Sequence, residues 1–194
     1  MSSSSPLAPR GLVASALVLL GCAGVAAPIS EEGPGDDPRA LIAHLQELEA
    51  TGRYGEVLAC ITPHLRQTYV FISWFGAAYD AIGSDPDVGD DYRAIVSTHG
   101  LDEEWLSEDA TGRDGLRKVA AQALRGVELA PLLDDLARFR AEHGRFGTAF
   151  GFEGELRELH VEEDWARARI DDTELELVHI EGAWTWCPFP DLAR

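Results

Sequence analysis

Apolar and polar residues alternate from position 156 to position 187, the pattern of strands that bury one side and expose the other. Pairs of polar or glycine residues interrupt the alternation at 163–164, 171–172 and 181–182. Two-residue interruptions of this kind are typical of hairpin turns between antiparallel strands. The predicted strands are Leu156–Glu162, Trp165–Ile170, Thr173–Ile180 and Ala183–Cys187.

Turns of two residues also fix which residues face each other across neighbouring strands. The predicted pairs are Glu158 with Arg169 and Leu159 with Ala168 in the first hairpin, Arg169 with Glu174, Ala168 with Leu175, Arg167 with Glu176 and Ala166 with Leu177 in the second, and Leu177 with Trp186 and His179 with Trp184 in the third. One face of the sheet then carries Leu159, Val161, Ala166, Ala168, Ile170, Leu175, Leu177, His179, Trp184 and Trp186. The other face carries Glu158, His160, Arg167, Arg169, Glu174 and Glu176, with opposite charges side by side.

The residues before the sheet show helical spacing instead. Asp37-Pro38 and Thr62-Pro63 each combine an N-cap residue with a proline at the first helical position. The first pair predicts a helix that ends at Gly52, and the second predicts a helix through about Ile82 that is apolar on most sides and therefore central. Shorter helices are predicted at 54–61, 91–98, 102–106, 114–125 and 131–143.

These elements predict an α+β protein. Helices within 37–144 would pack on one face of a four-stranded antiparallel meander within 155–188, because an apolar sheet face has to be covered and the helices are available to cover it. Residues 37–194 are expected to form a single domain, a size that supports one hydrophobic core.

The N-terminus has a pattern of its own. An apolar run extends from Gly11 to Gly21, with Arg10 as the only charge before it. A run of this length suits the apolar region of a signal peptide, about 7–15 residues, and is shorter than the roughly 20 residues of a membrane-spanning helix. Residues 22–36 are small, acidic and rich in proline and glycine, which predicts a flexible tether.

The residues Leu19-Leu20-Gly21-Cys22 resemble the lipobox of bacterial lipoproteins. The resemblance implies a signal peptide over 1–21, a lipid on Cys22, and anchoring in an envelope membrane on its periplasmic or extracellular side. Simple secretion, with cleavage after Ala26 or Ala27, is an open alternative, and so is an uncleaved segment.

Acidic residues outnumber basic ones by 34 to 16, which gives a net charge of −18. Such a surface repels nucleic acids and anionic headgroups, so the charge argues against nucleic-acid binding. The acid is spread along the chain, as in many soluble exported proteins, and binding of cations or basic partners is the functional alternative.

The acidic segment from Gly83 to Asp91 raises the hypothesis of a calcium site. An EF-hand loop counted from Asp85 needs glycine at position 6 and glutamate at position 12, where this chain has Asp90 and Val96. The sequence therefore favours a solvated turn in which Asp90 is the N-cap of the next helix.

The strand sequences Trp165–Ile170 and Leu175–Trp186, with a Gly-x-Trp turn at Gly182, resemble the C-terminal strands of small NTF2-like (cystatin-like) bacterial envelope proteins. The resemblance implies a curved sheet wrapped on helices with a cavity between them. Some members of that family are isomerases or dehydratases, and many envelope members have no known activity. It implies no catalytic residue here, because no family motif matches.

A cavity of that kind would be lined by His179 and Trp184 of the sheet and by Trp74 of the central helix. A histidine acting as a general base needs a carboxylate partner, and the register predicts none beside His179. Packing of His179 on Trp184 is therefore favoured. The histidines show no metal-binding spacing, so neither a metal nor another cofactor is expected.

If Cys22 carries lipid, Cys60 and Cys187 remain as the pair available for a disulfide. The register places Cys187 on the polar face, whereas Cys60 lies in a helix expected on the other face. This argues against a bond, although Pro188 leaves open a turn of Cys187 towards the core.

These observations favour a non-catalytic lipoprotein of the bacterial envelope, with a lipid anchor in the membrane and an envelope protein as its candidate partner. The alternative is an NTF2-like domain that binds or transforms a small molecule in a cavity between helices and sheet. A cation-dependent module built on the segment near Asp85 is a third hypothesis. The sequence therefore favours a protein without enzymatic activity.

Overall fold

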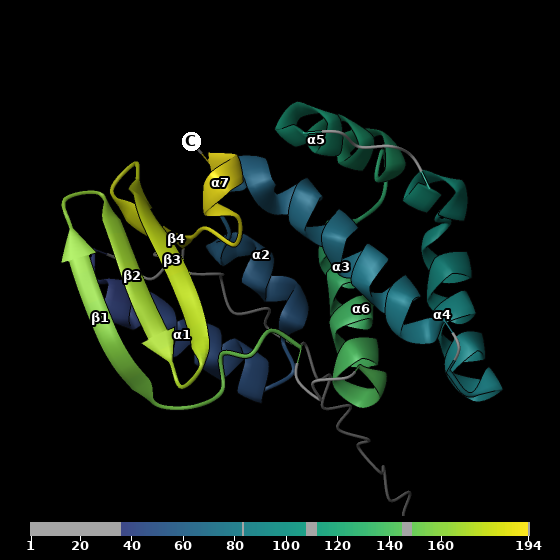
Figure 1. Cartoon of the computed structure of the whole chain (residues 1–194), viewed down its shortest axis with the longest axis horizontal. Coiled ribbons are helices and arrows are strands. Elements are labelled where there is room, and N and C mark those ends of the chain that lie inside the picture. Colours follow the sequence, from purple (N-terminus) through teal and green to yellow (C-terminus); the bar gives the residue numbers. More distant parts are fainter. Residues whose placement is uncertain (1–35, 83, 108–111, 145–148, 194) are drawn as a thin grey trace, which may run out of the picture. The chain divides into compact units, whose positions relative to one another are not determined.

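The computed structural model describes residues 36–82, 84–107, 112–144 and 149–193 (Figure 1). The predicted signal peptide 1–21, Cys22 and the tether up to residue 35 lie outside the described residues. Residues 32–194 group into one compact unit. No helix of the described part of the chain is both long enough and apolar enough to cross a membrane.

The predicted α+β class is confirmed: helices come first, a four-stranded antiparallel meander follows, and one short helix comes after it. The α-helices are α1 (Pro38–Ala50), α2 (Val57–Cys60), α3 (Arg66–Ala81), α4 (Pro86–His99), α5 (Gly112–Ala123), α6 (Leu129–His143) and α7 (Pro190–Ala193). Short 3-10 turns occur at η1 (Tyr54–Glu56), η2 (Pro63–Leu65) and η3 (Glu103–Ser107). The strands are β1 (Leu156–Glu162), β2 (Trp165–Ile170), β3 (Thr173–Ile180) and β4 (Ala183–Trp186).

Aspartate followed by proline starts two of the helices. The side chain of Asp37 accepts a hydrogen bond from the backbone N–H of Arg39 at the start of α1. Asp85 caps α4 in the same way, so the prediction that Asp90 is the cap was wrong: the helix begins one turn earlier because Pro86 already has the backbone angle of a first helical residue. Thr62 makes no cap bond with its side chain.

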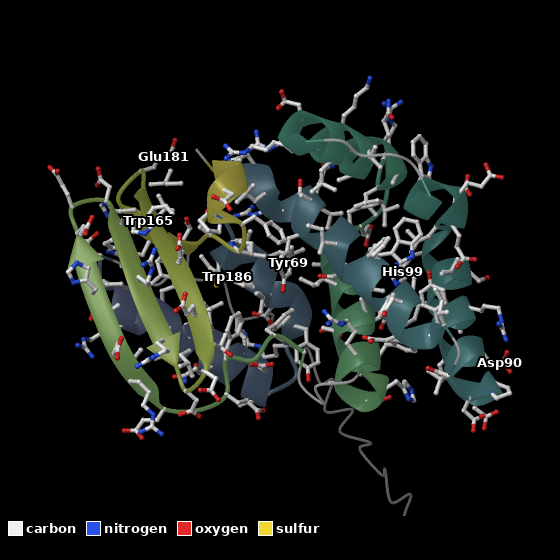
Figure 2. The ribbon with its side chains drawn as sticks, in the orientation of Figure 1. Tyr69, Asp90, His99, Trp165, Glu181 and Trp186 are labelled. Atoms are coloured by element: carbon white, nitrogen blue, oxygen red, sulfur yellow. The ribbon has the colours of Figure 1, made fainter. Side chains whose placement is uncertain are left out.

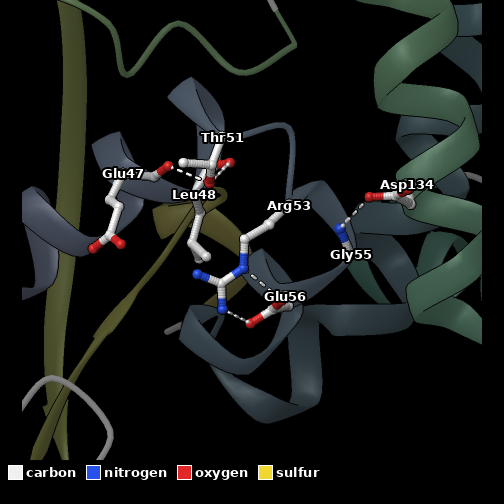
Figure 3. Close-up of polar contacts among 7 residues, drawn as sticks. All are labelled: Glu47, Leu48, Thr51, Arg53, Gly55, Glu56 and Asp134. Carbon is white, nitrogen blue, oxygen red and sulfur yellow. Dashed lines mark hydrogen bonds and ion pairs between the residues drawn. The ribbon is translucent and has the colours of Figure 1, made fainter. Parts of the chain in front are cut away.

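The connection after α1 brings the chain close to α6 (Figure 3). The hydroxyl of Thr51 donates to the backbone oxygen of Glu47 and ends α1, and the N–H of Gly55 donates to Asp134 of α6 across 3.2 Å. A Cβ atom at Gly55 would lie 2.5 Å from the carbonyl oxygen of Ala130. The close approach of η1 to α6 therefore requires glycine at this position.

All predicted strand pairs are confirmed. Glu158 faces Arg169 across β1 and β2, Arg167 faces Glu176 across β2 and β3, and the register continues into β4. A register shift between Leu156 and Glu158 marks a bulge at the start of β1. The sheet therefore sorts its apolar and charged residues onto the faces that the alternation predicts.

The residue after β4 departs from this sorting. Cys187 has a polar-face position in the register, yet it is 1% exposed. Its N–H continues the ladder to the carbonyl of Glu176, and the chain then turns so that the ring of Phe189 packs against Tyr69 of α3. Cys187 therefore keeps the register position that was predicted for it, and its side chain is buried there.

The apolar face of the sheet is covered by α1, which lies behind the strands in Figure 1 and contacts β4. The buried leucines of α1 and the small residues Ala166 and Ala168 of β2 belong to the same hydrophobic core. The indole of Trp184 donates to the carbonyl oxygen of Asp36, which fixes the start of α1 against β4. Small side chains in the inner strand leave room for this helix.

The helix predicted to be central, α3, packs against α4, α5 and α6. Trp74, Val70 and Ala77 are fully buried, as expected of a core helix. Its other side is open, since Phe75 is 51% and Tyr79 is 53% exposed. The prediction of a central helix therefore holds for the side that carries Trp74, whereas the apolar residues Phe75 and Tyr79 lie on the side that faces solvent.

The segment before the sheet is held by a buried carboxylate. Glu49 of α1 is 4% exposed, and its oxygens accept hydrogen bonds from the backbone N–H groups of Phe150, Gly151 and Phe152. Gln46 donates to the carbonyls of Phe152 and Gly154. Two side chains of one helix thus fix residues 150–154 and with them the entry into β1.

Candidate functional site

A depression lies on the charged face of the sheet, which faces the viewer in Figure 2. It has a volume of about 860 Å³ and runs along β1 and β2. We call it the outer groove. Its lining residues are Glu158, Leu159, His160, Glu162, Trp165, Arg167, Ala168, Arg169 and Glu174.

Cross-strand ion pairs set the charges of the outer groove. Arg167 bonds to Glu176 at 3.0 Å, and Arg169 pairs with Glu158 on the neighbouring strand. The imidazole of His160 lies 3.3 Å from the carboxylate of Glu162. The floor of the groove is therefore a ladder of paired charges that presents both donors and acceptors to a bound molecule.

Trp165 is the large aromatic side chain in the outer groove. It is half-buried and sits opposite Glu162 on β1 and Val178 on β3 (Figure 2). Tryptophan with one side open is a frequent anchor in protein interfaces. The sequence contained a signal for this position, because the confirmed register places Trp165 on the same face as Arg167, Arg169 and Glu176.

The predicted cavity residues are only partly brought together. His179 and Trp184 are in ring contact, with centroids 5.2 Å apart. Trp74 lies among the helices instead, where its indole donates to the hydroxyl of Tyr92, and burial raises the pKa of Tyr92 to about 12. Neither the outer groove nor the second groove, described next, includes His179, Trp184 or Trp74.

The prediction from the sequence did not include a carboxylate beside His179. Nδ1 of His179 lies 3.6 Å from Oδ1 of Asp164, which belongs to the turn between β1 and β2. The backbone joins the same two residues, because the N–H of His179 donates to the carbonyl of Asp164. A prediction by strand faces alone does not include turn residues, which is why this partner was overlooked.

A second groove of about 360 Å³ lies between α4 and α6. Two histidine–carboxylate contacts cross it: His99 to Asp135 at 2.9 Å and His143 to Asp91 at 3.2 Å. Each pair takes one residue from each helix, so the contacts tie α4 to α6. The described residues contain no group of three histidine, cysteine or acidic side chains placed to hold a metal ion.

The acidic residues near Asp85 serve the start of α4. The carboxylate of Asp85 accepts from the N–H of Asp87, and Asp90 pairs with Arg93 one turn further along. These contacts are those of a capped helix with an exposed ion pair.

No disulfide joins Cys60 and Cys187, although both side chains are buried. A parallel bridge pairs Ile61 with Trp186, so Thr62 rather than Cys60 comes level with Cys187. Burial raises the pKa of Cys60 to about 11, which keeps it a protonated thiol at neutral pH. Cys60 is therefore a core residue and a poor nucleophile.

The chain matches no known family model, and comparison with curated proteins and with solved structures gives no significant match.

Proposed function

We propose that this protein is a lipid-anchored binding protein of the bacterial cell envelope that engages a partner through the outer groove. The observation that carries the proposal is the groove itself, a charged depression of about 860 Å³ that contains a half-buried tryptophan. Its volume lies within the roughly 300–1,000 Å³ of ligand pockets, and tryptophan and arginine are enriched where interfaces bind most strongly.

The lipobox-like residues ending in Cys22 support the envelope location. A signal peptide over 1–21 would be removed, and Cys22 would become the lipid-bearing N-terminus. Residues 23–36 would then space the folded part from the membrane surface, since a chain rich in glycine and proline reaches outward without packing. In this arrangement the membrane holds the protein, and the outer groove is left to the partner.

The alternative is an NTF2-like domain that binds or transforms a small molecule between helices and sheet. The contact between His179, Trp184 and Asp164 is what favours it, because a histidine beside a carboxylate is a frequent acid–base pair. It has less support than the outer groove, because Trp74 lies with Tyr92 among the helices.

Site-directed photo-crosslinking in a bacterial host tests the proposal. A photo-crosslinking residue is placed at Arg167 in the groove, and in a matched variant at the exposed Lys118 on α5. We expect a discrete crosslinked adduct from position 167 and none from position 118, with the protein in the membrane fraction.

The variant Cys22→Ser tests the anchor in the same cells. It should accumulate as uncleaved, unacylated precursor and lose the adduct. Mature, unacylated protein cut near Ala26 in both chains would overturn the anchor. Equal labelling from positions 167 and 118 would overturn the groove as the binding surface.

A further inference from the structure

We propose that the open edge of β1 takes up an extended segment of a partner protein in which basic and apolar residues alternate. The inference rests on the proposed function, because the outer groove is the surface along which the partner's basic side chains would lie. It adds the chemistry and the binding mode of that partner: strand addition to a sheet edge.

The direction of the backbone groups in the sheet is the first observation. The carbonyl of Asp164 accepts a hydrogen bond from the N–H of His179, 3.0 Å away, so Asp164 faces β3. Backbone groups alternate in direction along a strand, and therefore Trp165 and Arg167 face β1.

The same alternation applies on β1. Glu162 and His160, the partners of Trp165 and Arg167, use their backbone groups towards β2. The intervening residues, Leu159 and Val161, then direct their N–H and C=O groups away from the sheet. A strand placed alongside would find these groups ready to bond.

The two edges of the sheet differ. Beside β4, Ile61 forms a parallel bridge to Trp186, and the N–H of Thr62 donates to the carbonyl of Trp186 at 3.0 Å. Beside β1, no strand pairs with the outer edge within the part of the chain that the structure describes. The position for an additional strand is therefore next to β1.

On the apolar face of the sheet, an added strand would place apolar side chains next to β1. Val161 is on the apolar face, yet it is 49% exposed because no strand lies beyond it. Leu159 on the same face is half-buried. An apolar side chain on every second residue of an added strand would cover both and extend the core by one row.

On the charged face of the sheet, an added strand would be favoured by positive charge. The acidic residues in and around β1 are Glu153, Glu155, Glu158, Glu162, Glu163 and Asp164, against Arg157 and His160 as the basic ones, and an acidic excess remains after Glu155 pairs with Arg157 and Glu158 with Arg169. Opposite charges on neighbouring strands attract, and like charges repel. A second copy of this chain would bring the same acidic edge, so the excess favours a different protein with lysine or arginine on alternate residues.

Binding of synthetic peptides to the full chain in detergent micelles tests the proposal. The probe is acetyl-Lys-Val-Lys-Val-Lys-Val-Lys-amide, and its control is a peptide of the same composition with the lysines and valines in blocks. We expect the alternating peptide to bind at least about tenfold more tightly by calorimetry, because only its lysines and valines segregate to opposite faces of a strand. Equal binding of both peptides would show charge attraction alone and would overturn the proposal.

The variants Val161→Pro and Val161→Ala separate the backbone from the side chain. Proline removes the outward N–H of residue 161 without breaking a bond to β2, and should weaken binding at least about tenfold relative to Val161→Ala, which keeps that N–H. Equal affinities would overturn strand addition.

Modified peptides keep the test decisive if the proline variant does not fold. N-methylation of every second peptide residue blocks either the N–H groups that face β1 or those that face away. One series should lose binding at least about tenfold relative to the other. Equal loss in both would contradict a strand that pairs along one edge.

The outcomes also separate this inference from the proposed function. A crosslinked adduct at position 167 without binding of the alternating peptide would leave the groove as the binding surface and refute strand addition. Peptide binding without an adduct in cells would confirm the edge chemistry and refute the groove's role in the envelope.

Discussion

Replacing Glu49 by glutamine should destabilise the fold, because this buried carboxylate holds the segment that leads into the sheet. The carboxylate is 4% exposed and accepts three backbone hydrogen bonds, of 2.7 Å from Phe150, 3.0 Å from Gly151 and 2.5 Å from Phe152. Glutamine has the same shape but offers one accepting oxygen and one NH2 group. If the glutamine oxygen accepts the hydrogen bonds from the N–H groups of Phe150 and Gly151, the NH2 group points at the N–H of Phe152. Two donors then face each other, and the third hydrogen bond is lost.

The expected cost follows from these contacts. The N–H of Phe152 is left without an acceptor at a fully buried residue, which costs about 1–3 kcal/mol. The two remaining bonds lose their charged acceptor and about 0.5–1 kcal/mol each. Relief from burying a charge offsets part of the sum, so we expect a net loss of about 2–3 kcal/mol. For a domain of this size the melting temperature should fall by about 5–10 °C.

Urea unfolding followed by tryptophan fluorescence measures this loss, with Glu47→Gln as the matched control. Glu47 is on the same helix but exposed, so the same chemical change should alter the unfolding free energy by less than about 0.5 kcal/mol. If Glu49→Gln is as stable as Glu47→Gln, the carboxylate does not hold residues 150–152, and the account of how the chain enters β1 is refuted.

Two further predictions concern the thiol of α2 and the last turn of the sheet. Burial raises the pKa of Cys60 to about 11, so its alkylation at pH 8, mapped by peptide mass spectrometry, should be about a hundredfold slower in the folded chain than in urea. Rapid labelling of the folded chain would contradict the burial. Because the folded state keeps the thiol proton to higher pH than the unfolded state does, the free energy of unfolding should fall as the pH rises from about 9 to about 11. In the β3–β4 turn, Glu181 and Gly182 both have a positive φ, of 53° and 86°. Asparagine adopts this conformation more readily than glutamate does, so Glu181→Asn should raise the melting temperature by about 2 °C. A lower melting temperature in a thermal scan would contradict this.

The strand register could be predicted from the sequence because its determinants are local. Each turn has two residues, and each strand alternates, so a slip by one residue would expose a whole apolar row. The first helix was predictable for a similar reason, since Asp37 and Pro38 act within one turn of chain. Where the deciding interactions lie within a few residues, a single sequence is sufficient.

The candidate site depended on interactions that are distant in the chain. The sequence placed Trp165 in a strand but gave no sign that the face it joins is hollowed. Trp186 and Phe189 at the end of the sheet pack against Tyr69 of α3, more than a hundred residues earlier in the chain. Asp164 lies opposite His179 because the register between β2 and β3 continues by one residue into the first turn. None of these contacts has a pattern within one segment.

The charges along β1 have two consequences. Exposed strand edges invite pairing with other chains, and proteins commonly oppose this with charged side chains and bulges. Here the bulge at the start of β1 and the acidic residues that follow oppose pairing with another copy, whose edge carries the same charge. The same acids attract a strand of opposite charge, and the outward groups of Leu159 and Val161 are left to bond with it. Protection against self-association and selection of a basic partner are therefore the same physical property of this edge, and they differ only in the charge of the approaching chain.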